Sequence, residues 1–173
     1  LERRAAAAGP NARAGTPAEA AQFGEVVVLA TPWGAVEDAL QAAGSLAGKV
    51  LVDCTNPLKA DFSGLAIGHT TSAAEEVARH ASGARVVKAF NTTGAGNMEN
   101  PRYGADRVTL FMCGDDGSAK ATVGRLAEEL DFDVVDAGAL TVARLLEQAA
   151  MLWIHLAYAQ GLGPNIAYKL LRR

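Results

Sequence analysis

Three loops in this sequence carry polar groups that could bind a ligand, and each follows a short apolar run. They are Thr31–Gly34, Thr55–Leu58 and Asn91–Asn97, and they are rich in hydroxyls, amides, proline and glycine. Such residues supply hydrogen bonds and allow close approach of the backbone without adding charge. This lining suits a ribose, a pyrophosphate and a carboxamide better than the transition state of a hydrolysis.

Each loop also has a purely structural interpretation. Thr31–Pro32 could be a helix N-cap with proline at the first helical position. Asn56–Pro57 could be an ordinary turn, Asn91–Asn97 could cap a helix, and Trp33 could pack in the core. Because the three loops follow successive predicted strands, where ligands bind in open α/β sheets, a shared binding role is favoured.

Side chains suited to acid–base catalysis are scarce, and no catalytic residue is predicted. His69 lies in an irregular loop, His80 ends a helix and His155 interrupts an apolar helix, so each fits a structural role better. Asp53 ends a buried strand, where it could cap the adjoining loop. No nucleophile elbow, paired histidine ligands or carboxylate cluster occurs, so no metal site is predicted. This composition fits direct hydride transfer, in which a cofactor carries the chemistry and the protein positions it.

Five short apolar runs are predicted as the strands that position these loops. Continuous apolar runs, rather than alternating ones, are typical of strands that are covered on both faces of a parallel sheet. The gaps between the runs are long enough for crossover helices, which predicts a doubly wound, mostly parallel α/β sheet. The predicted strands are Val26–Ala30, Val50–Asp53, Val86–Phe90, Val108–Met112 and Asp133–Val135.

Helical signals occupy the gaps between these runs. Ser72 and Glu75 have the spacing of a capping box, which predicts a helix over Ala73–Ala81. Ala139–Gln160 predicts a long closing helix, and Asn165–Leu171 predicts a short amphipathic end. The other predicted elements are helices at Glu2–Ala8, Pro17–Gln22, Ala35–Ala43 and Ala119–Leu130, and a short strand at Asn11–Ala14.

The composition narrows the class of protein. The 173 residues are 50% hydrophobic and 20% charged, with a net charge of −3, which fits one domain with a sizeable core. The weak negative charge, without a cluster of Lys and Arg, argues against a nucleic-acid partner. Ala149–Ile154, the longest clean apolar run of the closing helix, is too short to span a membrane. Cys54 and Cys113 have no metal-like spacing and favour a reducing, cytoplasmic setting.

Five segments resemble the motifs of a known family, in the same order. They are Val28–Trp33, Val52–Pro57, Val87–Thr92, Cys113–Asp116 and Asp136–Gly138. Here the sequence resembles the coenzyme F420 (deazaflavin)-dependent NADP oxidoreductase family. It is also similar to the NADP-binding domain of six-transmembrane metalloreductases and, more distantly, to the N-terminal domain of pyrroline-5-carboxylate reductases. The resemblance covers nearly the whole chain and implies a Rossmann-type fold with C-terminal helices.

The resemblance implies that NADP(H) binds in extended form across the strand ends. Thr31, Pro32 and Trp33 match the loop that lines the middle of the dinucleotide. Asn56 and Pro57 match the loop beside the nicotinamide ribose.

On the nicotinamide side, Thr93 and Ala95 match positions whose backbone holds the carboxamide. Asn91 stands where archaeal members have a histidine, so a proton relay through that position is not expected. Coenzyme F420 or a related flavin is expected to stack over the nicotinamide, between these loops and the C-terminal helices. Leu152–Trp153 and Gly161–Pro164 are then expected near its ring or at a dimer interface.

The chain departs from the family at its N-terminus. Members open with a strand, a Gly-x-Gly-x-x-Gly turn and a helix, followed by a second strand and a Ser-Arg pair, and this chain lacks that Gly-rich βα unit. We expect either that the chain is a fragment or that another chain fills the sheet edge. We also expect these 173 residues alone to bind NADP poorly. Residues 1–138 are then an N-terminally incomplete NADP-binding domain, and residues 139–173 are a helical segment packed on it.

The residues and the resemblance together predict an NADPH-dependent oxidoreductase. It is expected to transfer hydride between NADP(H) and a deazaflavin or flavin-type acceptor. The alternative is a non-enzymatic NADP-binding sensor or partner-binding module, and a reductase of a small imine or acid is a third option. A small-molecule acceptor, a homodimer and a cytoplasmic location are expected, without nucleic-acid or membrane partners.

Overall fold

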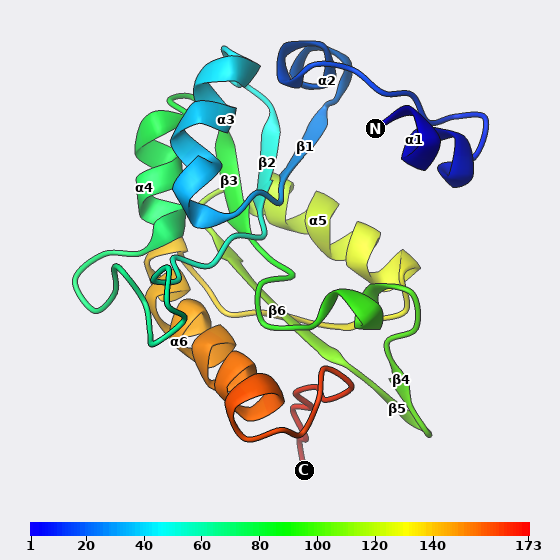
Figure 1. The fold of residues 1–173 in the computed structure, drawn as a ribbon, viewed down its shortest axis with the longest axis vertical. Coiled ribbons are helices and arrows are strands. Elements are labelled where there is room, and N and C mark those ends of the chain that lie inside the picture. The colour runs from blue at the N-terminus through cyan, green and yellow to red at the C-terminus, as the bar shows by residue number, and fades with distance from the viewer.

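A five-stranded sheet forms the centre of the protein (Figure 1). The computed structural model describes all 173 residues. All five predicted strands are confirmed, and their bounds differ from the predicted ones by no more than about two residues, the usual uncertainty of element ends. In their order across the sheet, the strands are β1 (Val26–Leu29), β2 (Val50–Asp53), β3 (Arg85–Lys88), β6 (Thr109–Gly114) and β7 (Asp133–Asp136).

The sheet is mostly parallel, as predicted. β1 pairs with β2, β2 with β3 and β6 with β7 in parallel, whereas β3 and β6 are antiparallel. The reversal follows from the connection, because a loop and a hairpin of β4 (Arg102–Tyr103) and β5 (Asp106–Arg107) join β3 to β6. A parallel return needs a crossover, which is usually an α-helix, and this connection holds only the short 3₁₀ helix η2 (Ala95–Met98). The carboxyl ends of β1, β2 and β3 therefore share one edge of the sheet, from which the three predicted loops emerge.

Helices cover both faces of the sheet. The helices α3 (Val36–Ala43), α4 (Ala73–His80) and α6 (Ala143–Ile154) pack on one face, and α5 (Gly117–Glu129) packs on the other (Figure 1). Ser72 caps the start of α4 as predicted, because its side chain accepts a hydrogen bond from the Glu75 N–H at 3.2 Å, whereas the Glu75 carboxylate accepts from the Ser72 hydroxyl at 2.7 Å. The doubly wound α/β architecture is thus confirmed.

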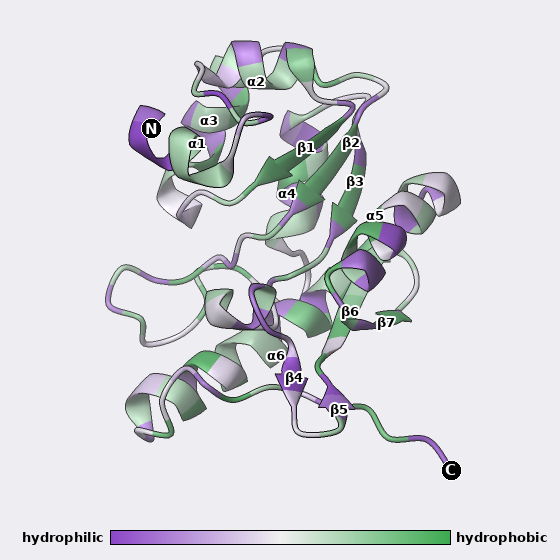
Figure 2. Cartoon of the chain, turned by 90° about the vertical axis from the view of Figure 1, so that its right-hand side faces the viewer, coloured by the Kyte–Doolittle hydropathy of each residue, from purple (hydrophilic) through white to green (hydrophobic).

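Two apolar clusters fill the space between the sheet and its helices. On β2, Leu51 belongs to the cluster under α3, α4 and α6, whereas Val50 and Val52 belong to the cluster under α5. This division follows from the alternation of side chains along a strand. In Figure 2 β1 and the middle of β2 and β3 are apolar, as expected for strands with helices on both faces, whereas charged residues lie at the ends of β2 and β3.

The segment before the sheet is only partly as predicted. The helices α1 (Glu2–Ala8) and α2 (Pro17–Phe23) are confirmed. The predicted strand at Asn11–Ala14 is wrong, because these residues are exposed coil. A strand must satisfy its backbone hydrogen bonds through a neighbouring strand, and these residues pair with none.

The long closing helix is confirmed. The 3₁₀ turn η3 (Leu140–Val142) leads into α6, and a π-helical turn, η4 (His155–Ala159), extends it until Gly161 with a φ of 72°. The following segment is extended and returns to the start of β6, where the Tyr168 carbonyl accepts a hydrogen bond from the Thr109 N–H at 2.9 Å. No helix combines the length and the apolar character that a bilayer crossing requires.

Candidate functional site

A cavity of about 690 Å³ lies at the carboxyl ends of β1, β2 and β3. Its wall contains residues from all three predicted loops, so the sheet brings together segments that are far apart in the sequence. Of the eight predicted binding residues only Pro57 is outside the wall, and it is buried in the same loop as Asn56. The other seven line the cavity: Thr31, Pro32, Trp33, Asn56, Asn91, Thr93 and Ala95.

A second cavity of about 730 Å³ adjoins the first. Its far wall is formed by the closing helix and the turn after it, with Trp153, Ile154, Tyr158 and Pro164. Trp153 and Pro164 are among the residues expected near an acceptor ring, whereas Leu152 lies on the outer face of α6 and is 52% exposed. Six residues line both cavities and form a shared wall: Asn56, Leu58, Phe62, Asn91, Thr93 and Ala95.

Two amides in the shared wall hold each other. Asn56 Nδ2 donates to the Asn91 carbonyl at 3.0 Å, and Asn91 Nδ2 donates to Asn56 Oδ1 at 3.1 Å. Asn91 Nδ2 also donates to the Leu146 carbonyl of α6 at 3.2 Å. The loops after β2 and β3 are thereby fixed to one another and to the closing helix.

Two polar atoms of the first cavity's lining residues have no protein partner. Thr31 Oγ1 and Asn91 Oδ1 are buried and make no hydrogen bond within the chain. A buried polar group without a partner costs about 1–3 kcal/mol. A bound group that supplies hydrogen bonds would relieve this cost, and the ribose and carboxamide of a nicotinamide nucleotide have donors and acceptors of this kind. The residues present therefore fit such a cofactor.

A hydrogen-bonded chain supports Thr93 from behind the shared wall. Asn97, which is buried, donates from Nδ2 to Thr93 Oγ1 at 2.8 Å and to the Ile166 carbonyl at 3.3 Å. The Tyr103 hydroxyl donates to Asn97 Oδ1 at 3.0 Å. The Trp153 indole N–H donates to the same Ile166 carbonyl at 2.8 Å, so the C-terminal segment is part of the support.

Gly94 is required by the close approach of Trp153. A Cβ atom at Gly94 would lie 2.9 Å from both Cη2 and Cζ2 of the Trp153 ring and 3.2 Å from the Pro164 carbonyl oxygen. Side chains larger than hydrogen therefore cannot enter this position without displacing the ring. The second cavity thus owes its shape partly to a glycine in the loop after β3.

Two phenylalanines at the cavities adopt the left-handed backbone conformation. Phe90 has a φ of 63° where β3 leads into its loop, and Phe62 has a φ of 57° in the loop after β2. This conformation costs a non-glycine residue roughly 1–2 kcal/mol. The Phe90 ring packs edge-on against Phe132, with centroids 5.9 Å apart, and this burial offsets the cost. Strained residues of this kind cluster at binding sites.

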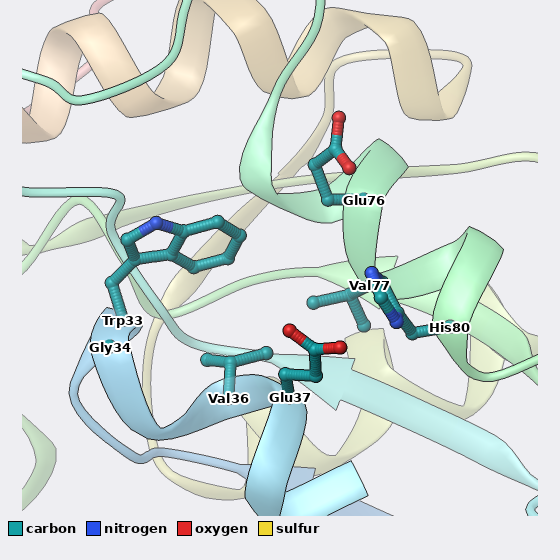
Figure 3. A pocket seen from close by; sticks show the side chains of 7 residues that line it. All are labelled: Trp33, Gly34, Val36, Glu37, Glu76, Val77 and His80. Atoms are coloured by element: carbon teal, nitrogen blue, oxygen red, sulfur yellow. The ribbon is translucent and has the colours of Figure 1, made fainter. Parts of the chain in front are cut away.

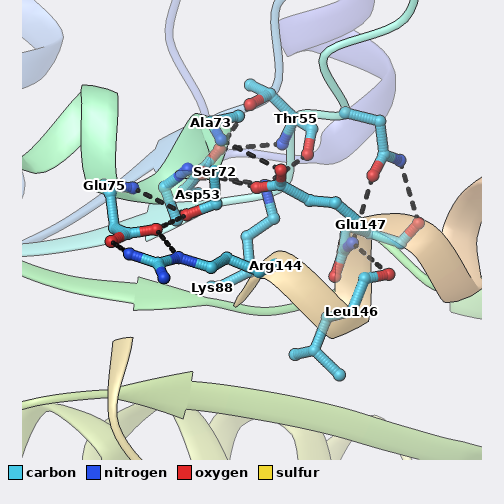
Figure 4. Close-up of polar contacts among 12 residues, drawn as sticks. Asp53, Thr55, Ser72, Ala73, Glu75, Lys88, Arg144, Leu146 and Glu147 are labelled. Carbon is cyan, nitrogen blue, oxygen red and sulfur yellow. Dashed lines mark hydrogen bonds and ion pairs between the residues drawn. The ribbon is translucent and has the colours of Figure 1, made fainter. Parts of the chain in front are cut away.

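Charged side chains lie behind the loops, in the core (Figure 4). Lys88 of β3 is fully buried, and its ammonium contacts Asp53 Oδ2 at 2.9 Å, Glu147 Oε1 at 3.0 Å and the Thr55 carbonyl at 2.5 Å. Asp53 Oδ1 accepts from both the N–H and the hydroxyl of Thr55, at 2.9 and 2.7 Å. The predicted capping role of Asp53 is confirmed, and the charged cluster holds the loop that carries Asn56.

Glu147 connects this cluster to two helices. It projects from α6 and accepts hydrogen bonds from the N–H groups of Ala73 and Ala74 at the start of α4, at 2.9 and 3.2 Å. Burial raises the pKa of the Glu147 carboxyl, and the Lys88 ammonium together with the two N–H groups limits that rise. Sequence reasoning missed this cluster. Two signals were available, a lysine inside the apolar β3 run and a glutamate inside the apolar helix.

An outer ion pair reinforces the same contact between helices. Arg144 donates from Nε and Nη2 to the two carboxylate oxygens of Glu75, at 2.9 and 2.5 Å. These hydrogen bonds lower the pKa of Glu75 below its ordinary value. Figure 4 shows this pair beside the buried cluster, with Glu75 on α4 and Arg144 on α6.

Groups that could exchange protons with a ligand are few. Among the residues lining the two cavities, only Cys54, Lys59 and Tyr158 have ionisable side chains. Burial raises the pKa of the Cys54 thiol to about 12, so the thiol stays protonated near neutral pH. No group of three or more His, Cys, Asp or Glu side chains could hold a metal ion.

The three histidines line neither cavity. His80 borders a separate groove of about 340 Å³ between α3 and α4, with Glu37 and Glu76 (Figure 3). Trp33 lies at the edge of this groove and also lines the first cavity, so its indole separates the two spaces. His155 contacts Gln160, outside the cavities.

Comparison with known proteins shows the family to which the chain belongs. A family model described as NADP oxidoreductase coenzyme F420-dependent matches residues 1–57. The crystal structure of a candidate F420-dependent NADP-reductase from Arthrobacter sp. FB24 matches with a TM-score of 0.83 at 38% identity, over 90% of this chain and 73% of that chain. The chain belongs to the coenzyme F420-dependent NADP oxidoreductase family. The predicted Rossmann-type fold with C-terminal helices is confirmed.

Two curated relatives match over part of their length. F420-dependent NADP reductase from Methanothermobacter marburgensis is 33% identical in a match 155 residues long, which covers 82% of this chain and 66% of that protein. Metalloreductase STEAP3 from Rattus norvegicus is 35% identical over 130 residues, which are 75% of this chain and 25% of that protein. The chain therefore spans less than two thirds of either relative. A reductive aminase from Aspergillus terreus, 22% identical with a TM-score of 0.60, shares the fold alone.

Proposed function

We propose that the protein binds NADP(H) in the first cavity and transfers hydride between its nicotinamide and a deazaflavin or flavin-type acceptor in the second. The observation that carries the proposal is the wall shared by the two cavities. Six residues line both cavities, so the two spaces adjoin at these residues and ligands bound in them can come into contact. A hydride moves directly only between rings in close contact, and adjoining cavities fit that requirement.

We assign the cofactor residues by the resemblance of their loops to those of the family, and the place of these loops at the first cavity supports the assignment. Thr31, Pro32 and Trp33 contact the middle of the dinucleotide, and Asn56 with the adjacent Pro57 borders the nicotinamide ribose. The unpartnered Thr31 Oγ1 supports the first assignment. The amide of Asn56, held by the Asn91 carbonyl, supports the second.

Thr93, Ala95 and Asn91 hold the nicotinamide end in this proposal. They belong to the shared wall, which is where a reacting ring has to lie. The aromatic side chains of Trp153, Tyr158 and Phe62 suit a planar acceptor ring in the second cavity. Residues 139–173 are then the acceptor-side segment of the protein, and residues 1–138 the cofactor-side domain.

Bound NADPH supplies the hydride, and the protein positions the two reacting rings. The neutral Cys54 thiol, with its pKa of about 12, is a poor proton donor, and Lys59 and Tyr158 are exposed to solvent. The proton that balances acceptor reduction therefore comes from solvent. The residues of the two walls orient the rings and exclude water from the space between them.

Anaerobic assay of the full-length protein with NADPH and 8-hydroxy-5-deazaflavin tests the proposal, with flavin mononucleotide as a second acceptor. Loss of the oxidised acceptor's visible absorbance, dependent on both protein and NADPH, is the expected result. Tight NADPH binding without reduction of either acceptor would instead favour a non-enzymatic NADP-binding sensor or partner-binding module.

We infer in addition a homodimer in a reducing, cytoplasmic setting. Exposed apolar side chains gather on the closing helix and the turn after it, with Leu145, Leu152 and Leu162 each more than half exposed. Apolar surface of this kind is a usual feature of an interface. Both cysteines are free, which fits a reducing compartment. Sedimentation equilibrium of the protein and of Leu152→Lys tests the dimer, and we expect the substitution to yield monomers.

A further inference from the structure

The geometry points to a donor role for the Thr93 hydroxyl, which is set by Asn97 and Tyr103. We propose that Thr93 donates a hydrogen bond to a carbonyl oxygen of the ligand that lies against the shared wall. Asn97 acts as a positioning residue that prevents the hydroxyl from serving as an acceptor instead. This inference rests on the proposed function, because it concerns the ligands of the same two cavities.

The orientation of the Asn97 amide is determined by its surroundings. The Ile166 carbonyl can only accept, so the nitrogen of Asn97, and not its oxygen, must face it. The opposite side of the amide receives the Tyr103 hydroxyl at Oδ1. Rotating the amide by half a turn would place two oxygens against each other at Ile166. The Nδ2 group therefore has one hydrogen for Ile166 and one for Thr93.

The polarity of Thr93 follows from this orientation. Its Oγ1 accepts from Asn97 Nδ2 at 2.8 Å, and no protein acceptor lies within reach of its own hydroxyl hydrogen. Thr93 is partly exposed and lines both cavities. The free hydrogen is thus available to a ligand at the shared wall. Its chemical complement is a carbonyl oxygen, which both the nicotinamide carboxamide and the ring of a deazaflavin or flavin provide.

Buried and hydrogen-bonded groups behind Thr93 fix the direction of this hydrogen bond. Asn97 is only 5% exposed, and the Ile166 carbonyl that orients it is also held by the Trp153 indole. Tyr103 lies in the β4–β5 hairpin, so an element that sequence reasoning did not predict contributes to the site. A hydrogen bond whose polarity is set in advance selects ligands by acceptor position and not only by shape.

Thr93→Val removes the hydroxyl and keeps the shape of the side chain. We expect it to weaken either the NADPH Kd or the acceptor KM about 3- to 10-fold, the usual effect of one hydrogen bond. Thr93→Ser, the matched control, keeps the donor and should stay within about 2-fold of wild type by the same estimate. A valine variant that equals wild type in both quantities, or a serine variant that loses as much as valine, would overturn the inference.

Two arms identify the source of the carbonyl. If it belongs to the nicotinamide, wild type should prefer NADPH over its thionicotinamide analogue, and Thr93→Val should lose that preference. If it belongs to the acceptor, the NADPH Kd stays unchanged and only the acceptor KM rises. Full-length wild-type protein that binds no NADPH overturns the proposed function and this inference together. Wild type that turns over while Thr93→Val is unchanged overturns this inference alone.

The positioning role of Asn97 is tested by its dependence on Thr93. Asn97→Leu should weaken the affected constant about 2- to 4-fold, less than Thr93→Val, because the hydroxyl remains but its direction is no longer set. In the Thr93→Val background the same substitution should add nothing, whereas an equal loss in both backgrounds would overturn the positioning role. If Asn97→Leu does not fold, Tyr103→Phe in the exposed hairpin replaces it with the same two-background comparison.

Discussion

The polar groups behind the loops and those in front of them differ in charge and in how completely they are paired. Behind, the cluster of Asp53, Lys88 and Glu147 is charged, buried and fully paired within the chain. In front, the cavity lining is uncharged apart from the exposed Lys59, and two of its buried oxygens, in Thr31 and Asn91, have no partner. The charged cluster thus forms a fixed frame that holds the loops in place, whereas the neutral groups that are left partly unpaired are available to bind a ligand.

The different costs of leaving a charged and a neutral group unpaired explain this arrangement. A buried ion pair is strongly directional but tolerates no loss of a partner, which suits a contact that never opens. A neutral hydroxyl or amide is much cheaper to leave unpaired, so it can exchange partners when a ligand arrives or departs. Lys88 connects the two regions, because it also holds the Thr55 carbonyl at the base of the Asn56 loop.

The largest expected effect comes from breaking the frame at Lys88. Lys88→Met leaves Asp53 and Glu147 buried without a counter-ion, so the free energy of unfolding should fall by about 3–5 kcal/mol. Urea denaturation at pH 7 measures the change. Lys169→Met is the matched control, because Lys169 pairs with Asp133 near the surface and should cost less than about 1 kcal/mol. Equal losses in the two variants would contradict the distinction between frame and surface.

A substitution at Gly94 alters the ligand side through packing. Gly94→Ala forces the new Cβ against the Trp153 ring, and we expect a loss of about 1–3 kcal/mol in unfolding free energy with a distorted second cavity. Gly96→Ala places its Cβ in open space in the same loop and should be nearly neutral. Thermal unfolding and acceptor KM measure both. A Gly94 variant as stable as the Gly96 variant would show that the ring moves freely.

Thr31→Val separates binding from stability. The substitution removes a buried hydroxyl that has no partner in the chain, so unfolding free energy should stay the same or rise slightly. The NADPH Kd should increase about 3- to 10-fold, because the ligand loses one hydrogen bond. Calorimetry beside urea denaturation measures the pair of quantities. A variant that binds NADPH normally but is destabilised would mean that Thr31 belongs to the frame.

The smallest effect is expected at the outer ion pair. Arg144 lowers the pKa of Glu75, so this pair contributes stability that is present above the ordinary carboxyl pKa of about 4.3 and is lost as pH falls through the lowered pKa. Glu75→Gln should therefore lose about 0.5–1 kcal/mol at pH 7 and progressively less in acid. Glu128→Gln, at an exposed glutamate without an ion pair, is the control. A loss that grows in acid would contradict the pairing.

Much of the fold could be predicted because its signals are local. The five apolar runs, the N-cap at Ser72 and the long apolar closing helix all express short-range preferences, and each is present in the structure. The reversal of β6 could not be predicted in this way. It depends on the hairpin at Arg102–Arg107, whose strands are two residues long and exposed, and therefore show no apolar pattern.

The candidate site also has features that could be predicted from the sequence and features that could not. The three loops follow predicted strands, so their meeting at one sheet edge could be foreseen, and seven of the eight predicted residues line one cavity. Their binding roles stay predictions. The contacts of Lys88 with Glu147 and of Asn97 with the Ile166 carbonyl could not be foreseen, because they depend on how α6 and the C-terminal segment return to the sheet.

Direct transfer across the shared wall is tested most simply with labelled cofactor. The full-length protein is incubated anaerobically with 8-hydroxy-5-deazaflavin and NADPH that carries deuterium at C4 in one or the other of its two configurations, and the reduced acceptor is analysed by mass spectrometry. We predict one deuterium, retained on a ring carbon of the acceptor, from one configuration only. Reduced acceptor without deuterium from either configuration, or no reduction at all, would contradict direct hydride transfer between the two cavities.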